Sequence, residues 1–123
     1  IIKMKKIPCL VLVAGLVNSS CDDCSNENVI DGGANLVFGK QNVISGTSNA
    51  IKGSTNTISG SSNTAIGSNL NVAGDLNELR ATRTNVKGAS NIIHSSDSNI
   101  KGSGNIIAGA ENDVFGDKNI LKG

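Results

Sequence analysis

The sequence is poor in the large side chains from which most proteins build a core. Its 123 residues include no Trp, no Tyr, two Phe and one Pro. Any core must therefore be built on aliphatic side chains, which is unusual for a globular domain. With no aromatic platform for stacking bases and a net charge of +1, the chain also lacks the features of a nucleic-acid-binding protein.

Groups suited to catalysis or metal binding are equally scarce. The one histidine, His94, lies far from the cysteines in the sequence, so a zinc site on Cys21 and Cys24 would lack two ligands. We expect His94 to be a solvated surface residue. Glu78 and Asp113 stand alone, and no paired carboxylates or Ser/His/Asp set is visible. We therefore predict no enzyme activity, no metal and no cofactor.

The N-terminus resembles a secretory signal over residues 1–20. Met4 is the expected start, two lysines follow it, and residues 9–17 are apolar before the small residues Ser19 and Ser20. The apolar run is too short to span a bilayer, so we expect no membrane association once the signal is removed. The alternative is a buried strand or helix.

Residues 21–31 form a predicted lead-in segment that contains Cys21 and Cys24. Outside the cell this even pair is a candidate disulfide. A redox CxxC motif normally lies beside a βαβ unit, and none is apparent here.

From Gly32 to Gly123 the sequence repeats every seven residues without interruption. Glycine occupies twelve of the fourteen positions in this frame, and asparagine follows three residues later in ten of thirteen cases. Two residues further on, every position is apolar. These thirteen residues are Val37, Ile44, Ile51, Ile58, Ala65, Val72, Leu79, Val86, Ile93, Ile100, Ile107, Val114 and Leu121.

A period of seven is typical of coiled coils, but this repeat does not fit one. Each heptad has one dependable apolar position instead of two, and a glycine in every heptad would cost a helix about 1 kcal/mol. Asn, Ser and Thr favour turns. We therefore predict an all-β solenoid over residues 32–123, in which a short strand centred on each aliphatic residue precedes a turn that needs the positive φ of glycine.

The exceptions to the repeat indicate how many heptads make one coil. Leu70, Thr84 and Ser98 replace asparagine at intervals of fourteen, and Ala81 and Ser95 replace glycine at the same interval. A coil of about 14 residues places both sets on one edge, so we predict a two-faced β-roll with all thirteen aliphatics buried. The other asparagine column should form a structural ladder. It consists of Asn35, Asn49, Asn63, Asn77, Asn91, Asn105 and Asn119.

Segments of the repeat resemble the ice-binding, recrystallisation-inhibiting domain of cold-tolerant grasses, of the perennial ryegrass antifreeze type. Examples are "NVISG", "NTISG" and "GSSNT". The resemblance covers residues 32–123. It implies a left-handed β-roll, secretion to the apoplast and adsorption to ice through a flat face. We expect inhibition of ice recrystallisation, modest depression of the freezing point and a monomer.

Either face of the predicted roll could meet ice. Short outward side chains favour the first face, whose candidate residues are Val43, Ser45, Thr57, Ser59, Asn71, Ala73, Asn85 and Asn99. The second face is interrupted by Glu78 and Arg80. Its candidate residues are Ala50, Thr64, Ile66, Ile92, Ile106 and Ala108.

Two other functions fit a 14-residue roll. The heads of trimeric bacterial adhesins have a similar period, although their repeats favour the Ala-rich wording S-x-A-x-G. A purely structural or self-assembling solenoid is the other alternative.

Overall fold

The computed structural model describes residues 29–123, where fourteen short strands follow one another and no helix occurs. The strands are β1 (Val29–Asp31), β2 (Leu36–Phe38), β3 (Val43–Ser45), β4 (Ala50–Ser54), β5 (Thr57–Ser59), β6 (Thr64–Ser68), β7 (Leu70–Ala73), β8 (Glu78–Ala81), β9 (Thr84–Lys87), β10 (Ile92–Ser95), β11 (Ser98–Lys101), β12 (Ile106–Ala108), β13 (Asp113–Phe115) and β14 (Ile120–Lys122).

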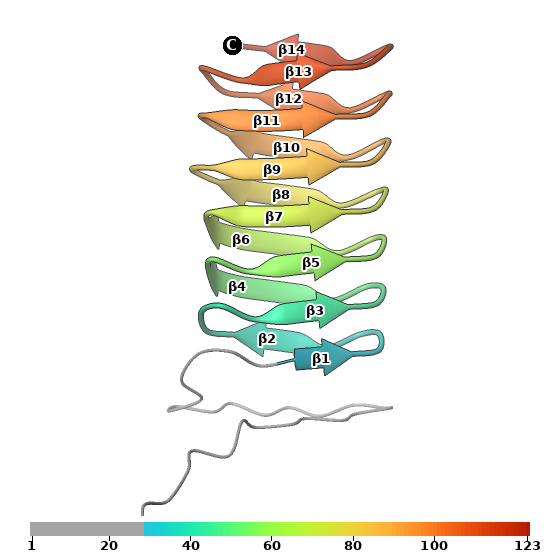
Figure 1. Ribbon diagram of the computed structural model, residues 1–123, viewed down its shortest axis with the longest axis vertical. Coiled ribbons are helices and arrows are strands. Elements are labelled where there is room, and N and C mark those ends of the chain that lie inside the picture. Colours follow the sequence, from blue (N-terminus) through green and yellow to red (C-terminus); the bar gives the residue numbers. More distant parts are fainter. Residues whose placement is uncertain (1–28) are drawn as a thin grey trace, which may run out of the picture.

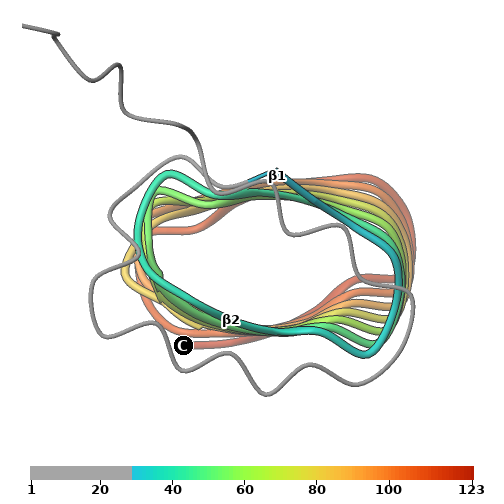
Figure 2. The same cartoon turned by 90° about the horizontal axis from the view of Figure 1, so that it is seen from below.

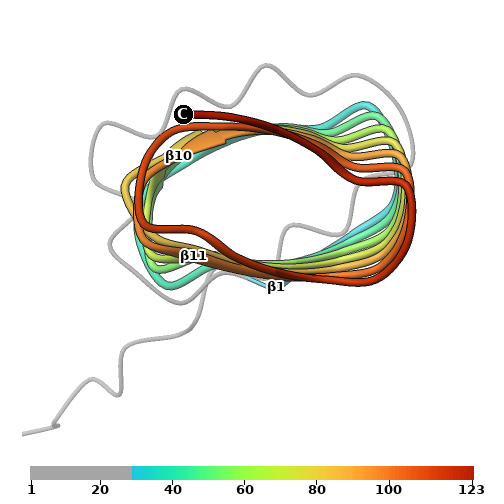
Figure 3. The same ribbon diagram turned by 90° about the horizontal axis from the view of Figure 1, so that it is seen from above.

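The strands form two parallel sheets of seven. The odd-numbered strands make one sheet, here called the odd sheet, and the even-numbered strands make the other, the even sheet. Every strand pairs with the strand one coil away, so that Ile44 lies beside Ile58 and Ile51 beside Ala65. The coils stack in a regular column (Figure 1) and form a flattened ring when viewed along the axis (Figures 2 and 3). The predicted two-faced β-solenoid with two heptads per coil is confirmed.

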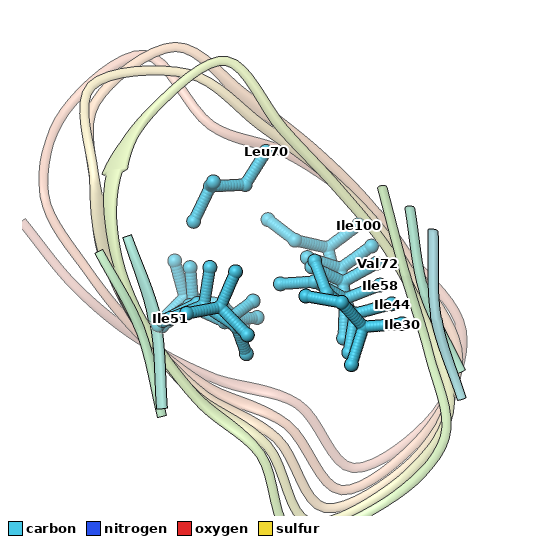
Figure 4. Packing of buried hydrophobic residues seen from close by; sticks show 13 residues of the cluster. Ile30, Ile44, Ile51, Ile58, Leu70, Val72 and Ile100 are labelled. Atoms are coloured by element: carbon cyan, nitrogen blue, oxygen red, sulfur yellow. The ribbon is translucent and has the colours of Figure 1, made fainter. Parts of the chain in front are cut away.

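The core lies between the two sheets as facing rows of aliphatic side chains (Figure 4). Eleven of the thirteen predicted core residues are buried, and most are completely inaccessible to solvent. The prediction is wrong for the final two. Val114 is partly buried and Leu121 is 56% exposed, because no described coil lies beyond β14 to cover them.

Two further aliphatic side chains join the core outside the thirteen predicted positions. Ile30 belongs to β1, which precedes Gly32 and pairs with β3. Leu70 replaces an asparagine and lies at an edge of the ring, apart from the two main rows (Figure 4). The roll therefore starts at or before Val29.

The turns lie along two edges of the roll. The ladder edge comprises residues 32–35 and their equivalents every fourteen residues, and the variable edge comprises residues 39–42 and their equivalents. A Cβ added to Gly46 would overlap the carbonyl oxygen of Gly32 in the preceding coil, and Gly46 has a φ of 139°. Glycine is thus required here for both its small size and its positive φ.

A second left-handed residue occurs in almost every turn, directly before the asparagine column. Eleven non-glycine residues have φ between 54° and 60°, among them Ser48, Thr55 and Leu76. Left-handed backbone costs an ordinary residue roughly 1–2 kcal/mol. The cost is offset by turn geometry, since the N–H groups of Ser48 and Thr55 donate to carbonyls of the next coil.

Candidate functional surfaces

Seven asparagines form a continuous hydrogen-bonded ladder inside the ladder edge. The Asn77 Oδ1 atom accepts from the backbone N–H of Asn63 at 2.9 Å and from its Nδ2 at 3.1 Å. The same pair of bonds links every neighbouring member from Asn35 to Asn119. Asn77 Nδ2 also donates to the Gly60 carbonyl at 3.2 Å. These side chains hold adjacent coils together, and the five inner members of the ladder are buried, while Asn35 and Asn119 at its ends are partly buried.

The outer face of the odd sheet presents two straight columns of side chains. Register brings Val43, Thr57 and Asn71 into one column and Ser45, Ser59 and Ala73 into the other. The first column continues through Asn85 and Asn99. All eight residues predicted for the preferred face are exposed on this one surface. Strand β1 precedes the repeat that begins at Gly32, and it adds Val29 and Asp31 to the two columns.

The outer face of the even sheet brings together the alternative set. Ala50 and Thr64 share one column with Ile92 and Ile106, while Ile66 and Ala108 lie in the second column. Its exposed side chains are larger and more apolar than those of the odd sheet. They include Leu36, Phe38, Ile66, Ile92, Ile106 and Ile120, each between 40% and 52% exposed.

Charged residues interrupt the even sheet at its centre. Arg80 and Glu78 lie on β8 and form an ion pair of 3.4 Å, with side chains 63% and 46% exposed. His94 follows Arg80 in the same column and is exposed. Surface depressions of about 370 and 260 Å³ also lie beside the even sheet, the first along Lys52 and Ile66 and the second along Thr64 and Ile92.

A metal site within residues 29–123 would need a cluster of nitrogen, oxygen or sulfur ligands. No set of three or more His, Cys, Asp or Glu residues there is arranged to hold a metal ion. Glu78 and Asp113 lie on different sheets, consistent with their isolation in the sequence. The Cys21–Cys24 pair and the signal over residues 1–20 lie outside the described residues. The features of residues 29–123 that could bind a ligand are therefore the extended, regular outer faces of the two sheets.

These features define a class: a parallel β-solenoid whose surfaces are regular columns of side chains and whose asparagines are structural. A family model described as grass antifreeze beta roll matches residues 23–123, and the chain belongs to that family. This is a non-enzymatic kind of protein that binds ice. Neither curated proteins nor solved structures gave a match.

Proposed function

We propose that the protein adsorbs to ice through the outer face of the odd sheet and thereby inhibits ice recrystallisation. The supporting observation is the block of six short side chains on β3, β5 and β7 that lie in register. Neighbouring strands in a sheet lie about 4.8 Å apart, and alternate residues along a strand lie about 6.7 Å apart. The block therefore repeats on a regular grid, where ordered water can join the ice lattice.

The composition of this block suits weak and regular hydration. Its residues are Val43, Thr57, Asn71, Ser45, Ser59 and Ala73. Its members carry methyl, hydroxyl or amide groups and no charge. The even sheet is less suitable because the Glu78–Arg80 ion pair divides it and depressions flank it. Larger side chains such as Ile66 and Phe38 are also exposed there.

The small extent of the block supports recrystallisation inhibition more than strong freezing-point depression. Only three strands contribute to it before Lys87 enters the second column. A small contact area holds ice weakly, but slow pinning of many grain boundaries suffices to stop crystals from coarsening. We expect modest freezing-point depression for the same reason.

The test is to anneal a polycrystalline ice wafer with wild type and two single variants. Thr57→Lys places a long hydrated cation at the centre of the odd-sheet block, and Thr64→Lys makes the matched change on the even sheet. Both threonines are exposed, so the fold should persist. Thr57→Lys should abolish inhibition and Thr64→Lys should not. The reverse pattern would assign ice binding to the even sheet, and an inactive wild type would refute ice binding altogether.

The proposal includes secretion, with the apoplast as the expected location in a plant, action as a monomer, and ice as the partner. The order of charged, apolar and small residues over residues 1–20 supports export. Within residues 29–123 no helix is long and apolar enough to cross a membrane.

A further inference from the structure

Two lysines lie on the odd sheet directly beyond the block of short side chains. Lys87 and Lys101 occupy the same column as Ser45, Ser59 and Ala73, since Ala73 pairs with Lys87 and Lys87 with Lys101. We infer that these two lysines set the length of the ice-contact surface. The inference rests on the proposed function and identifies the residues that limit it.

The backbone does not end the surface at β7. Strands β7, β9 and β11 pair in unbroken register, and the first column continues with the identical residues Asn71, Asn85 and Asn99. The core residues behind them, Val86 and Ile100, are fully buried. The flat sheet surface therefore extends two coils beyond Ala73. Only the second column changes, because lysine replaces the short uncharged side chains there.

The lysine side chains are poorly suited to an ice-contact surface. Each carries a compact, strongly hydrated ammonium on a flexible stem. Neither forms an ion pair with a carboxylate in the described part of the chain, so their charges stay in water. The Lys101 Nζ atom lies 5.8 Å from the centroid of the Phe115 ring, within cation–π range. Lys101 therefore leans along the face toward β13 instead of swinging clear of it.

Replacing both lysines should lengthen the contact surface from three coils to five. The variant is Lys87→Ser combined with Lys101→Ser, which copies Ser45 and Ser59 into the later coils. We expect the concentration that just stops recrystallisation to fall by about tenfold, equivalent to about 1.4 kcal/mol. Lys87→Ser alone should give part of that gain, and Lys101→Ser alone should give none, because Lys87 still separates β11 from the block.

Two matched controls separate this inference from a general effect of charge. Lys52→Ser with Lys122→Ser removes the same charge from the outer face of the even sheet. Lys87→Arg with Lys101→Arg keeps charge and length at the tested positions. Neither control should improve activity, and circular dichroism melting should show that all variants remain folded.

The outcomes distinguish this inference from the proposed function. If wild type is inactive on ice, the proposed function fails and this inference fails with it. If wild type is active and Thr57→Lys inactive, but the double serine variant gains nothing, only this inference is overturned. An equal gain from the even-sheet control would overturn it too, because net charge would then be the cause.

Discussion

The two edges of the roll form their turns with different backbone conformations and different residues. On the ladder edge, all seven glycines from Gly32 to Gly116 have positive φ, and the asparagine column is complete. On the variable edge, Gly67, Ala81 and Ser95 lack positive φ, and the strands β6, β8 and β10 extend through these positions. The turn is thus reshaped over three consecutive coils.

The hydrogen bonding differs accordingly. On the variable edge Asn42 bonds to Asn56 as on the ladder edge, but Leu70 follows and offers no acceptor. The Asn56 Nδ2 atom is consequently buried without a hydrogen-bond partner. Further along, the Thr84 hydroxyl donates to that of Ser98 at 2.8 Å and replaces the amide ladder with a hydroxyl pair.

Sheet register is the same on both sides of this change. Asn71, Val72 and Ala73 pair with the equivalent residues of β5 and β9 just as their counterparts do elsewhere. The sheets and the aliphatic core therefore set the coil spacing, and the edge side chains adapt to it. Replacements of the repeat's glycine and asparagine therefore occur only on the variable edge, where the backbone conformation of the turn also changes.

The largest expected effect comes from placing an alanine at a glycine position of the ladder edge, because the variable edge already holds Ala81 at the equivalent position. Gly74→Ala adds a Cβ that would overlap the Gly60 carbonyl oxygen, at a φ of 140°. We expect loss of cooperative thermal unfolding by circular dichroism. The reverse change, Ala81→Gly, should leave the roll folded. A stable Gly74→Ala variant would show that the ladder edge can also be reshaped.

A smaller effect should follow from breaking the ladder at one rung. Asn77→Ala removes the acceptor for the buried backbone N–H of Asn63. An unsatisfied buried group costs about 1–3 kcal/mol, and the bonds made by the lost Nδ2 add to this, so we expect a loss of about 2–4 kcal/mol.

The matched variant on the variable edge is Thr84→Val, which removes one hydroxyl from a pair. It should cost about 1 kcal/mol. Urea unfolding measures both free energies, and equal losses would mean that the two edges contribute alike.

The smallest effect concerns the left-handed residue before each asparagine. Thr55 is β-branched at a φ of 58°, so Thr55→Gly should stabilise the roll by about 0.5 kcal/mol after the entropy cost of glycine. Arg83 occupies the equivalent site two coils further along the same variable edge and has no positive φ. Arg83→Gly should therefore destabilise the roll by about 0.5–1 kcal/mol. Melting temperatures that shift in the same direction would contradict this assignment.

Much of the fold was predictable because period and burial are linked. A uniform repeat with one aliphatic residue and one glycine in each heptad disfavours a helix and favours stacked β-coils, which bury every aliphatic copy. The fourteen-residue spacing of Leu70, Thr84 and Ser98 further distinguished two heptads per coil from three. The candidate surface followed too, because residues flanking a buried strand centre must point outward.

Other features were not predictable because they lack a residue signature. The left-handed position holds residues as different as Ala34, Leu76 and Glu111, so local preference does not reveal it. Leu70 falls outside the aliphatic frame, and its burial depends on which coils lie beside it, whereas Ile30 continues the frame one heptad before Val37. The exposure of Leu121 likewise reflects the absence of a described coil beyond β14.

The sequence by itself determined the period, the residues that face the core and the column that can form an amide ladder, because these depend on spacing along the chain. Tertiary structure decided which backbone each turn adopts, which polar group is left unpaired and how far a uniform surface extends. Those properties depend on contacts between residues fourteen apart. A glycine is needed where the preceding coil's carbonyl lies against it, and the Asn56 Nδ2 atom is left unpaired because the next coil offers it no acceptor.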